Sequence, residues 1–268
     1  MIANARMYAL GTATAEAWRI LLEWVGKRAG VALDVIDYPA PQPLAALWAR
    51  PDLGLAFMCG YPFANAALRP TLLAAPVPSP PQYGGQPVYW TDLVVSAAAA
   101  IADLHDAFGK RIAWTTEDSQ SGWHAPRLLL AAYARRHGAP LFAETVGPLV
   151  TPRNVALAVA DGQADVGALD SYAHDLLRRH EPALATRLRV IARTPATPIP
   201  PLVGAPAMDP TDAGKVREAL LGVAAAPELA AARVTLLLSG FTAVTADAYD
   251  ALVADARRAD ALGYPRIV

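Results

Sequence analysis

The segment Trp114–Arg127, which reads W-T-T-E-D-S-Q-S-G-W-H-A-P-R, lies between a short apolar run and a helical pattern that ends before Gly138. Ser119, Ser121 and Gly122 fall where that helix is predicted to begin, so hydroxyl groups and unpaired backbone N–H groups converge there. A helix start of this kind favours anions, because its N–H groups point outward and the helix dipole adds positive charge. The segment therefore predicts a strand, a turn and a helix that together form a candidate anion site.

Two features of the segment keep a simpler interpretation open. Serine is an ordinary capping residue, so Ser119 or Ser121 could cap the helix and bind no ligand. Glu117 and Asp118 would also repel a bound oxyanion unless their carboxylates point away. The motif alone does not decide between a capped helix and an anion site.

Strands and helices alternate on both sides of this segment, which predicts an α/β fold with mostly parallel sheets flanked by helices. A core-facing helix stripe is predicted from the spacing of Ala17, Ile20, Leu21, Trp24 and Val25. The predicted strands are residues 7–10, 31–38, 53–58, 111–114, 142–146, 164–169 and 187–192.

A proline-rich loop, residues 76–87, leads into an extended segment, residues 88–95, and a second proline-rich passage spans residues 194–203. We interpret residues 88–95 and 194–203 as two crossings between lobes. Lobe one then comprises residues 1–91 and 195–268, and lobe two is an insert of residues 92–194. Two lobes joined in this way enclose a cleft, which is a frequent place for small-molecule sites.

The composition excludes several classes of function. Hydrophobic residues make up 54% of the chain and charged residues 18%, which is typical of a compact globular protein. The net charge of −1 gives no signal for nucleic acid or anionic membranes. The single cysteine, Cys59, excludes an intramolecular disulfide and a cysteine-rich metal site.

No cofactor or metal ion is expected either. The five histidines lack H-x-x-x-H and H-E-x-x-H spacing, and we interpret most of them as solvated helix residues. No G-x-x-x-x-G-K-[ST] or G-x-G-x-x-G motif occurs for a nucleotide. The N-terminus as given shows no signal peptide, because charged residues interrupt any apolar region. We expect a periplasmic protein if a leader was omitted and a cytoplasmic one otherwise.

Several motifs, spread from about Tyr8 to about Val203, together resemble one known family. They are the Gly60-Tyr61 turn, Tyr89 in the first crossing, D-L-H-D-A-F-G-K-R before a strand, D-S-Q-S-G at the helix start, A-V-A-D-G-Q-A-D-V-G-A-L-D-S-Y and T-P-x-x-P-I-P-P. With these motifs the chain resembles the phosphonate-binding family of ABC-transporter solute receptors, which includes phosphate- and phosphite-binding members.

The resemblance implies a two-lobed periplasmic-binding-protein fold of type II. It implies a monomer that captures a small oxyanion between its lobes for uptake by an ABC permease. In such receptors the S-x-S helix start holds the oxyanion, aromatic residues of lobe one line the cleft, and an acid at a strand end meets a ligand amine. The expected ligand-binding residues are Tyr8, Tyr61, Tyr89, Ser119, Gln120, Ser121, His124, Arg153 and Asp170.

The chain departs from the family pattern near the expected oxyanion. Several members place a histidine there from a later loop, whereas residues 151–154 read T-P-R-N. We expect His124 or Arg153 to substitute for it. Trp123 and His124 beside the anion site are compatible with a larger or aromatic ligand.

Two other functions are open alternatives. A cytoplasmic ligand sensor could be built on the same fold. A serine-dependent enzyme could use Ser119 or Ser121 as nucleophile and His124 as base, because Ser121 and His124 are spaced i, i+3. The chain lacks a G-x-S-x-G elbow, and we do not expect an enzyme.

Overall fold

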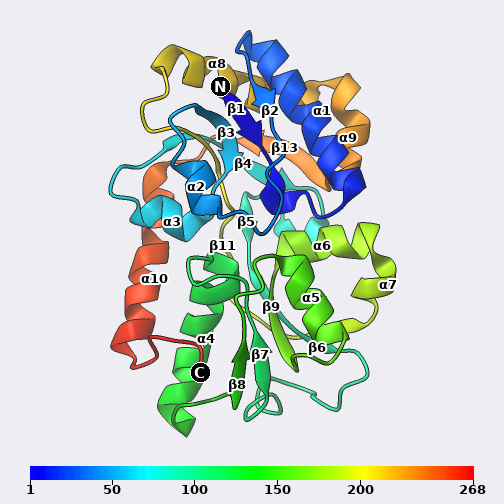
Figure 1. The fold of residues 1–268 in the computed structure, drawn as a ribbon, viewed down its shortest axis with the longest axis vertical. Helices are drawn as coiled ribbons and strands as arrows, with labels where there is room; N and C mark the ends of the chain where they lie inside the picture. Colours follow the sequence, from blue (N-terminus) through cyan, green and yellow to red (C-terminus); the bar gives the residue numbers. More distant parts are fainter. The chain divides into compact units, whose positions relative to one another are not determined.

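The computed structural model describes all 268 residues and divides them into two compact units (Figure 1). Unit 1 comprises Met1–Val88 and Pro198–Tyr249, and unit 2 comprises Tyr89–Thr197 and Asp250–Val268. Each unit contains one sheet with helices around it, as the α/β pattern predicts, but both sheets mix parallel and antiparallel pairs and are not mostly parallel. None of the helices combines the length and the apolar character that crossing a membrane requires.

Unit 1 is built on a six-stranded sheet with the order β13-β4-β12-β3-β1-β2. Its strands are β1 (Ile2–Asn4), β2 (Asp34–Val35), β3 (Leu53–Phe57), β4 (Thr71–Pro78), β12 (Leu202–Gly204) and β13 (Leu238–Thr242). β1 pairs in parallel with β2 and β3, whereas β12 and β13 run antiparallel to their neighbours. Its helices are α1 (Thr12–Ala29), α2 (Leu44–Trp48), α3 (Gly60–Asn65), α8 (Pro210–Gly222) and α9 (Ala230–Thr235), with short 3-10 turns η1 (Arg6–Tyr8), η2 (Pro81–Tyr83), η4 (Val223–Ala225), η5 (Pro227–Leu229) and η6 (Ala246–Tyr249).

Two predictions about the N-terminal region are wrong in detail. The first strand lies at β1 and not at residues 7–10, where η1 forms. Asn4 explains the early end of the strand, because its Oδ1 accepts a hydrogen bond from Arg6 N at 2.9 Å and turns the chain. In α1 the buried stripe includes Trp18, whereas Ile20 is 40% exposed.

Unit 2 is built on a five-stranded sheet with the order β10-β6-β9-β7-β8. Its strands are β6 (Thr91–Ser96), β7 (Arg111–Ala113), β8 (Glu144–Val146), β9 (Val166–Asp170) and β10 (Leu188–Arg193). β7 pairs in parallel with β8 and β9, while β6 and β10 are antiparallel. Its helical elements are a π-helical turn η3 (Gln120–His124), α4 (Ala125–His137), α5 (Pro152–Ala160), α6 (Ser171–His180), α7 (Pro182–Ala185) and α10 (Asp250–Ala261). The short strands β5 (Val88–Tyr89) and β11 (Thr197–Pro198), where the chain passes between the units, pair with each other.

The end of the chain belongs to unit 2, which differs from the predicted inclusion of residues 195–268 in lobe one. The reason is a long-range contact with α4. Arg127 is only 4% exposed and donates to the carbonyl oxygens of Ala256 and Pro265, both at 2.9 Å, besides contacting Asp260. The periodicity of apolar residues along the chain does not predict this contact. The two predicted crossings lie within a few residues of the observed boundaries.

Candidate functional site

The segment Trp114–Arg127 lies at the end of the unit 2 sheet where its parallel strands have their carboxyl termini. It follows the carboxyl end of β7, and the parallel neighbour β9 ends at Asp170. Ligands of parallel sheets bind beyond the carboxyl ends of their strands. The predicted helix start and the predicted acid therefore share the edge where a ligand site is expected.

Ser119 caps the helix, as the simpler interpretation expected. Its Oγ accepts a hydrogen bond from Gly122 N at 2.9 Å, and its carbonyl oxygen accepts from the amides of Trp123 and His124, both at 3.1 Å. Because the Ser119 hydroxyl acts as acceptor here, its own proton can still be donated to a ligand. Ser121 is different, because its buried side chain makes no hydrogen bond within the chain, to His124 or to any other residue.

The first turn of this helix is tightly packed against Thr115. A Cβ at Gly122 would lie 1.9 Å from Thr115 Oγ1 and 3.0 Å from Ser119 Oγ, so only glycine fits. Thr115 is 5% exposed, and its Oγ1 has no hydrogen-bond partner in the chain. Hydroxyl groups thus surround the helix start, whereas the carboxylate residues Glu117 and Asp118 are exposed.

Thr91 connects the helix start to Asp170. Its Oγ1 donates to the carbonyl oxygen of Ser121 at 2.8 Å, and in the sheet it pairs in register with Asp170. Asp170 is buried and caps α6, since its Oδ1 accepts from Ala173 N at 2.9 Å. Three predicted site residues, Ser119, Ser121 and Asp170, therefore belong to one connected edge of unit 2.

His124 is buried beside the same helix start. Burial, and secondly the positive charge of Arg127, lower the pKa of His124 to about 3. Arg127 Nη2 lies 3.4 Å from His124 Nδ1 and can only donate, which makes Nδ1 the acceptor. His124 is therefore a neutral imidazole at neutral pH, and it brings no positive charge to the helix start.

This buried imidazole is expected to reduce stability in acid. Its pKa is near 6.5 in the unfolded chain and about 3 in the fold, so the unfolded state binds the extra proton as the pH falls through this window. The free energy of unfolding of the wild type should fall by up to ~1.4 kcal/mol per pH unit from this residue. Melting curves between pH 7 and pH 4 should show a shallower loss for His124→Gln. Parallel losses in the two proteins would contradict the assignment.

The other predicted ligand residues are distributed more widely. Gln120 is buried in η3 and Tyr89 is buried in β5, just before Thr91. Tyr8 and Tyr61 belong to unit 1, where Tyr8 packs edge-to-face on Phe57 with ring centroids 5.0 Å apart and Tyr61 is half-buried at the start of α3. Their contact with a ligand stays a prediction.

Arg153 already has an ionic partner. Its guanidinium binds both carboxylate oxygens of Glu181 at distances between 2.8 and 3.0 Å. His124 and Arg153 are the two expected substitutes for the absent histidine. His124 lies at the helix start, whereas Arg153 forms an ion pair with Glu181. No group of three or more His, Cys, Asp or Glu side chains lies where it could hold a metal ion.

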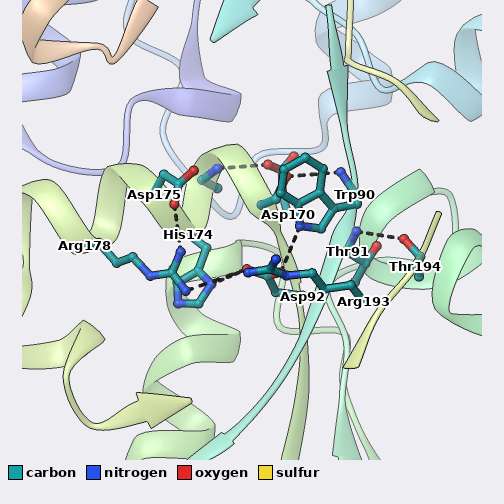
Figure 2. Close-up of polar contacts among 11 residues, drawn as sticks. Trp90, Thr91, Asp92, Asp170, His174, Asp175, Arg178, Arg193 and Thr194 are labelled. Atoms are coloured by element: carbon teal, nitrogen blue, oxygen red, sulfur yellow. Dashed lines mark hydrogen bonds and ion pairs between the residues drawn. The ribbon is translucent and has the colours of Figure 1, made fainter. Parts of the chain in front are cut away.

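The sequence analysis missed a buried polar cluster around Asp92 (Figure 2). His174, expected to be solvated, is 1% exposed, and its Nδ1 lies 2.8 Å from Asp92 Oδ2. Burial raises the pKa of the Asp92 carboxyl, but the hydrogen bond from His174 and the charge of Arg193 outweigh it, so the pKa lies below its usual value. The one sequence signal is a carboxylate inside the apolar strand Y-W-T-D-L-V-V, because a buried carboxylate needs donors.

The comparisons with known proteins agree with this architecture. Residues 9–249 match the family model described as "ABC transporter, phosphonate, periplasmic substrate-binding protein". No curated protein matches the sequence.

Several solved structures are similar to this chain. A binding protein component of an ABC phosphonate transporter from Pseudomonas aeruginosa shares 20% identity with a TM-score of 0.82, over 98% of this chain and 87% of that one. PhnD1 from Prochlorococcus marinus, solved with methylphosphonate, shares 15% identity with a TM-score of 0.74, over 97% and 98% of the two chains. A protein from Xanthomonas citri bound to ATP shares 20% identity with a TM-score of 0.67, over 97% and 98%. At these identities the similarity shows the two-lobed fold.

Proposed function

Because the chain belongs to the periplasmic substrate-binding family of ABC phosphonate transporters, we propose that it captures a small oxyanion of the phosphonate, phosphate or phosphite class for uptake. The observation that supports this most is the helix start at Ser119–Gly122. There a Ser121 hydroxyl without a partner in the chain and a capped first turn lie at the carboxyl edge of β7 and β9. The methylphosphonate complex of the Prochlorococcus marinus protein supports the same ligand class.

In unit 2 the proposed anion site relies on neutral donors. His124 is uncharged at neutral pH, and the guanidinium of Arg127 is occupied by α10 and the chain end. Hydroxyls of Ser119 and Ser121 would donate to the oxyanion, and hydrogen bonds to a charged acceptor are stronger than neutral ones. The dipole of the helix that continues through α4 adds attraction for the anion.

The proposal is tested by thermal shift against phosphate, phosphite, methylphosphonate, aminoethylphosphonate and sulfate. A ligand at 100 times its Kd should stabilise the wild type by about 2.7 kcal/mol, which a melting curve resolves. Ser121→Ala should lose most of this shift, because it removes a donor that no protein group uses. The exposed Ser239→Ala serves as the matched control and should keep it. No shift with any of these anions, from folded and ligand-free protein, would refute the proposal.

The carboxylate of Asp170 favours a ligand that also carries an amine. Asp170→Asn keeps an oxygen that can cap α6 but removes the negative charge. We expect it to weaken aminoethylphosphonate at least tenfold and methylphosphonate much less, as measured by isothermal titration. Equal losses for both ligands would show that Asp170 does not meet the amine.

Partner and compartment follow from the family. We propose that the protein acts in the periplasm as a monomer and delivers its ligand to a membrane permease. The family binds solutes for transport, and the absence of catalysis in this chain is part of the proposal.

A further inference from the structure

A second buried polar group, outside the proposed anion site, is the carboxylate of Asp92 in β6 (Figure 2), whose side chain is 2% exposed. Its Oδ2 lies 2.8 Å from His174 Nδ1 in α6. Its Oδ1 accepts from Trp90 Nε1 and from Arg193 Nε of β10, both at 3.0 Å. One carboxylate therefore joins β6, β10 and α6.

The polar contacts of His174 are directed at Asp92. An ionised carboxylate only accepts hydrogen bonds, so the proton of the imidazole lies on Nδ1. The other ring nitrogen, Nε2, is buried and makes no hydrogen bond in the chain. The ring thus contributes one strong polar interaction, and that interaction fixes α6 to β6.

The same junction supports the proposed ligand residues. Ser171, at the start of α6, exchanges two hydrogen bonds with the backbone of Trp90, one through its Oγ at 3.1 Å and one through its amide at 2.9 Å. Thr91 lies between Trp90 and Asp92 in the chain, donates to the carbonyl oxygen of Ser121, and pairs with Asp170. A shift of β6 against α6 would therefore change the position of Ser121 relative to Asp170.

We propose that Asp92 and His174 are positioning residues for the ligand site, which hold Ser121 and Asp170 at the spacing that one ligand must span. Neither residue touches the ligand. This inference rests on the proposed function, because it assumes that an oxyanion binds near Ser121 and an amine near Asp170.

The test compares two substitutions of one residue. His174→Asn retains an N–H group near the position of Nδ1, whereas His174→Leu has similar bulk and no donor. Titration with aminoethylphosphonate should give binding at least tenfold weaker for the Leu variant and within threefold of wild type for the Asn variant. Methylphosphonate, which does not reach Asp170, should lose less affinity in the Leu variant than aminoethylphosphonate does. A generally damaged protein would lose both ligands equally.

Hydrogen exchange gives a readout that does not depend on a ligand. The amides of Ser171 and Ala173 should exchange faster in His174→Leu than in wild type, and His174→Asn should restore their protection. If His174→Leu does not fold, Trp90→Phe removes one donor to Asp92, and its weaker binding of aminoethylphosphonate replaces the Leu result.

Two results would overturn the inference separately from the proposed function. If the wild type binds both probes and the folded His174 variants bind them as tightly as the wild type does, the positioning role alone is excluded. Wild type that binds neither probe would remove the proposed function. Unchanged exchange at Ser171 and Ala173 in His174→Leu would then also exclude the positioning role.

Discussion

Alanine at position 122 is expected to abolish tight oxyanion binding and to lower the melting temperature. The new Cβ would lie 1.9 Å from Thr115 Oγ1 and 3.0 Å from Thr115 Cβ, inside contact distance, and Thr115 is buried. The first turn of the helix would have to shift, and with it the amide and hydroxyl of Ser121. Overpacking of this kind costs roughly 1–3 kcal/mol, and we expect oxyanion binding to weaken more than tenfold.

A second glycine provides the matched control for this substitution. Gly214 lies within α8, and a Cβ there would meet no atom within 4 Å. Gly214→Ala should leave binding unchanged and raise stability by up to ~1 kcal/mol, because alanine favours helices. Melting curves and titration of both variants check the pair. A Gly122→Ala protein that melts and binds like wild type would show that the packing of this turn does not control the site.

Replacement of Arg127 by methionine should release the end of the chain from unit 2. The guanidinium is buried and holds Asp260 and the carbonyl oxygens of Ala256 and Pro265. Breaking a buried pair costs about 3–5 kcal/mol, but Asp260 is exposed and can be hydrated, so we expect a loss of about 2–3 kcal/mol. Arg127→Lys should recover only part, because lysine lacks the planar fork.

Hydrogen exchange over residues 250–268 measures this release directly. Protection should fall in Arg127→Met and stay unchanged in Arg258→Met, which alters an exposed arginine of the same helix α10. Because His124 neighbours Arg127, oxyanion affinity should also fall in Arg127→Met. Equal protection in the two variants would show that the chain end is held by its apolar contacts alone.

The local parts of this structure could be predicted from the sequence. The strand before Trp114 and the helix that ends before Gly138 appear as β7 and α4, and the acid Asp170 stands at the end of β9. These features depend on neighbours in sequence, on capping residues and on apolar periodicity. The shared edge of β7 and β9 also follows, because parallel strands place their carboxyl ends together.

The parts that could not be predicted depend on distant contacts. The position of α10 depends on Arg127, which lies more than a hundred residues earlier in the chain. His174 looks like a solvated helix residue until its partner, Asp92 on another element, is known. The predicted stripe of α1 includes Ile20, which is exposed, and omits Trp18, which is buried, because the face that packs on unit 1 is rotated from the predicted one.

The central claim is that the oxyanion binds at the start of the helix that follows β7. We would label the serine and glycine amides with nitrogen-15 and titrate the protein with methylphosphonate, following the amide proton shifts. The account predicts a large downfield shift at Ser121, with a smaller one at Gly122, because the Ser121 amide would donate to the anion. Saturable binding with no shift at Ser121, and the largest changes elsewhere, would contradict it.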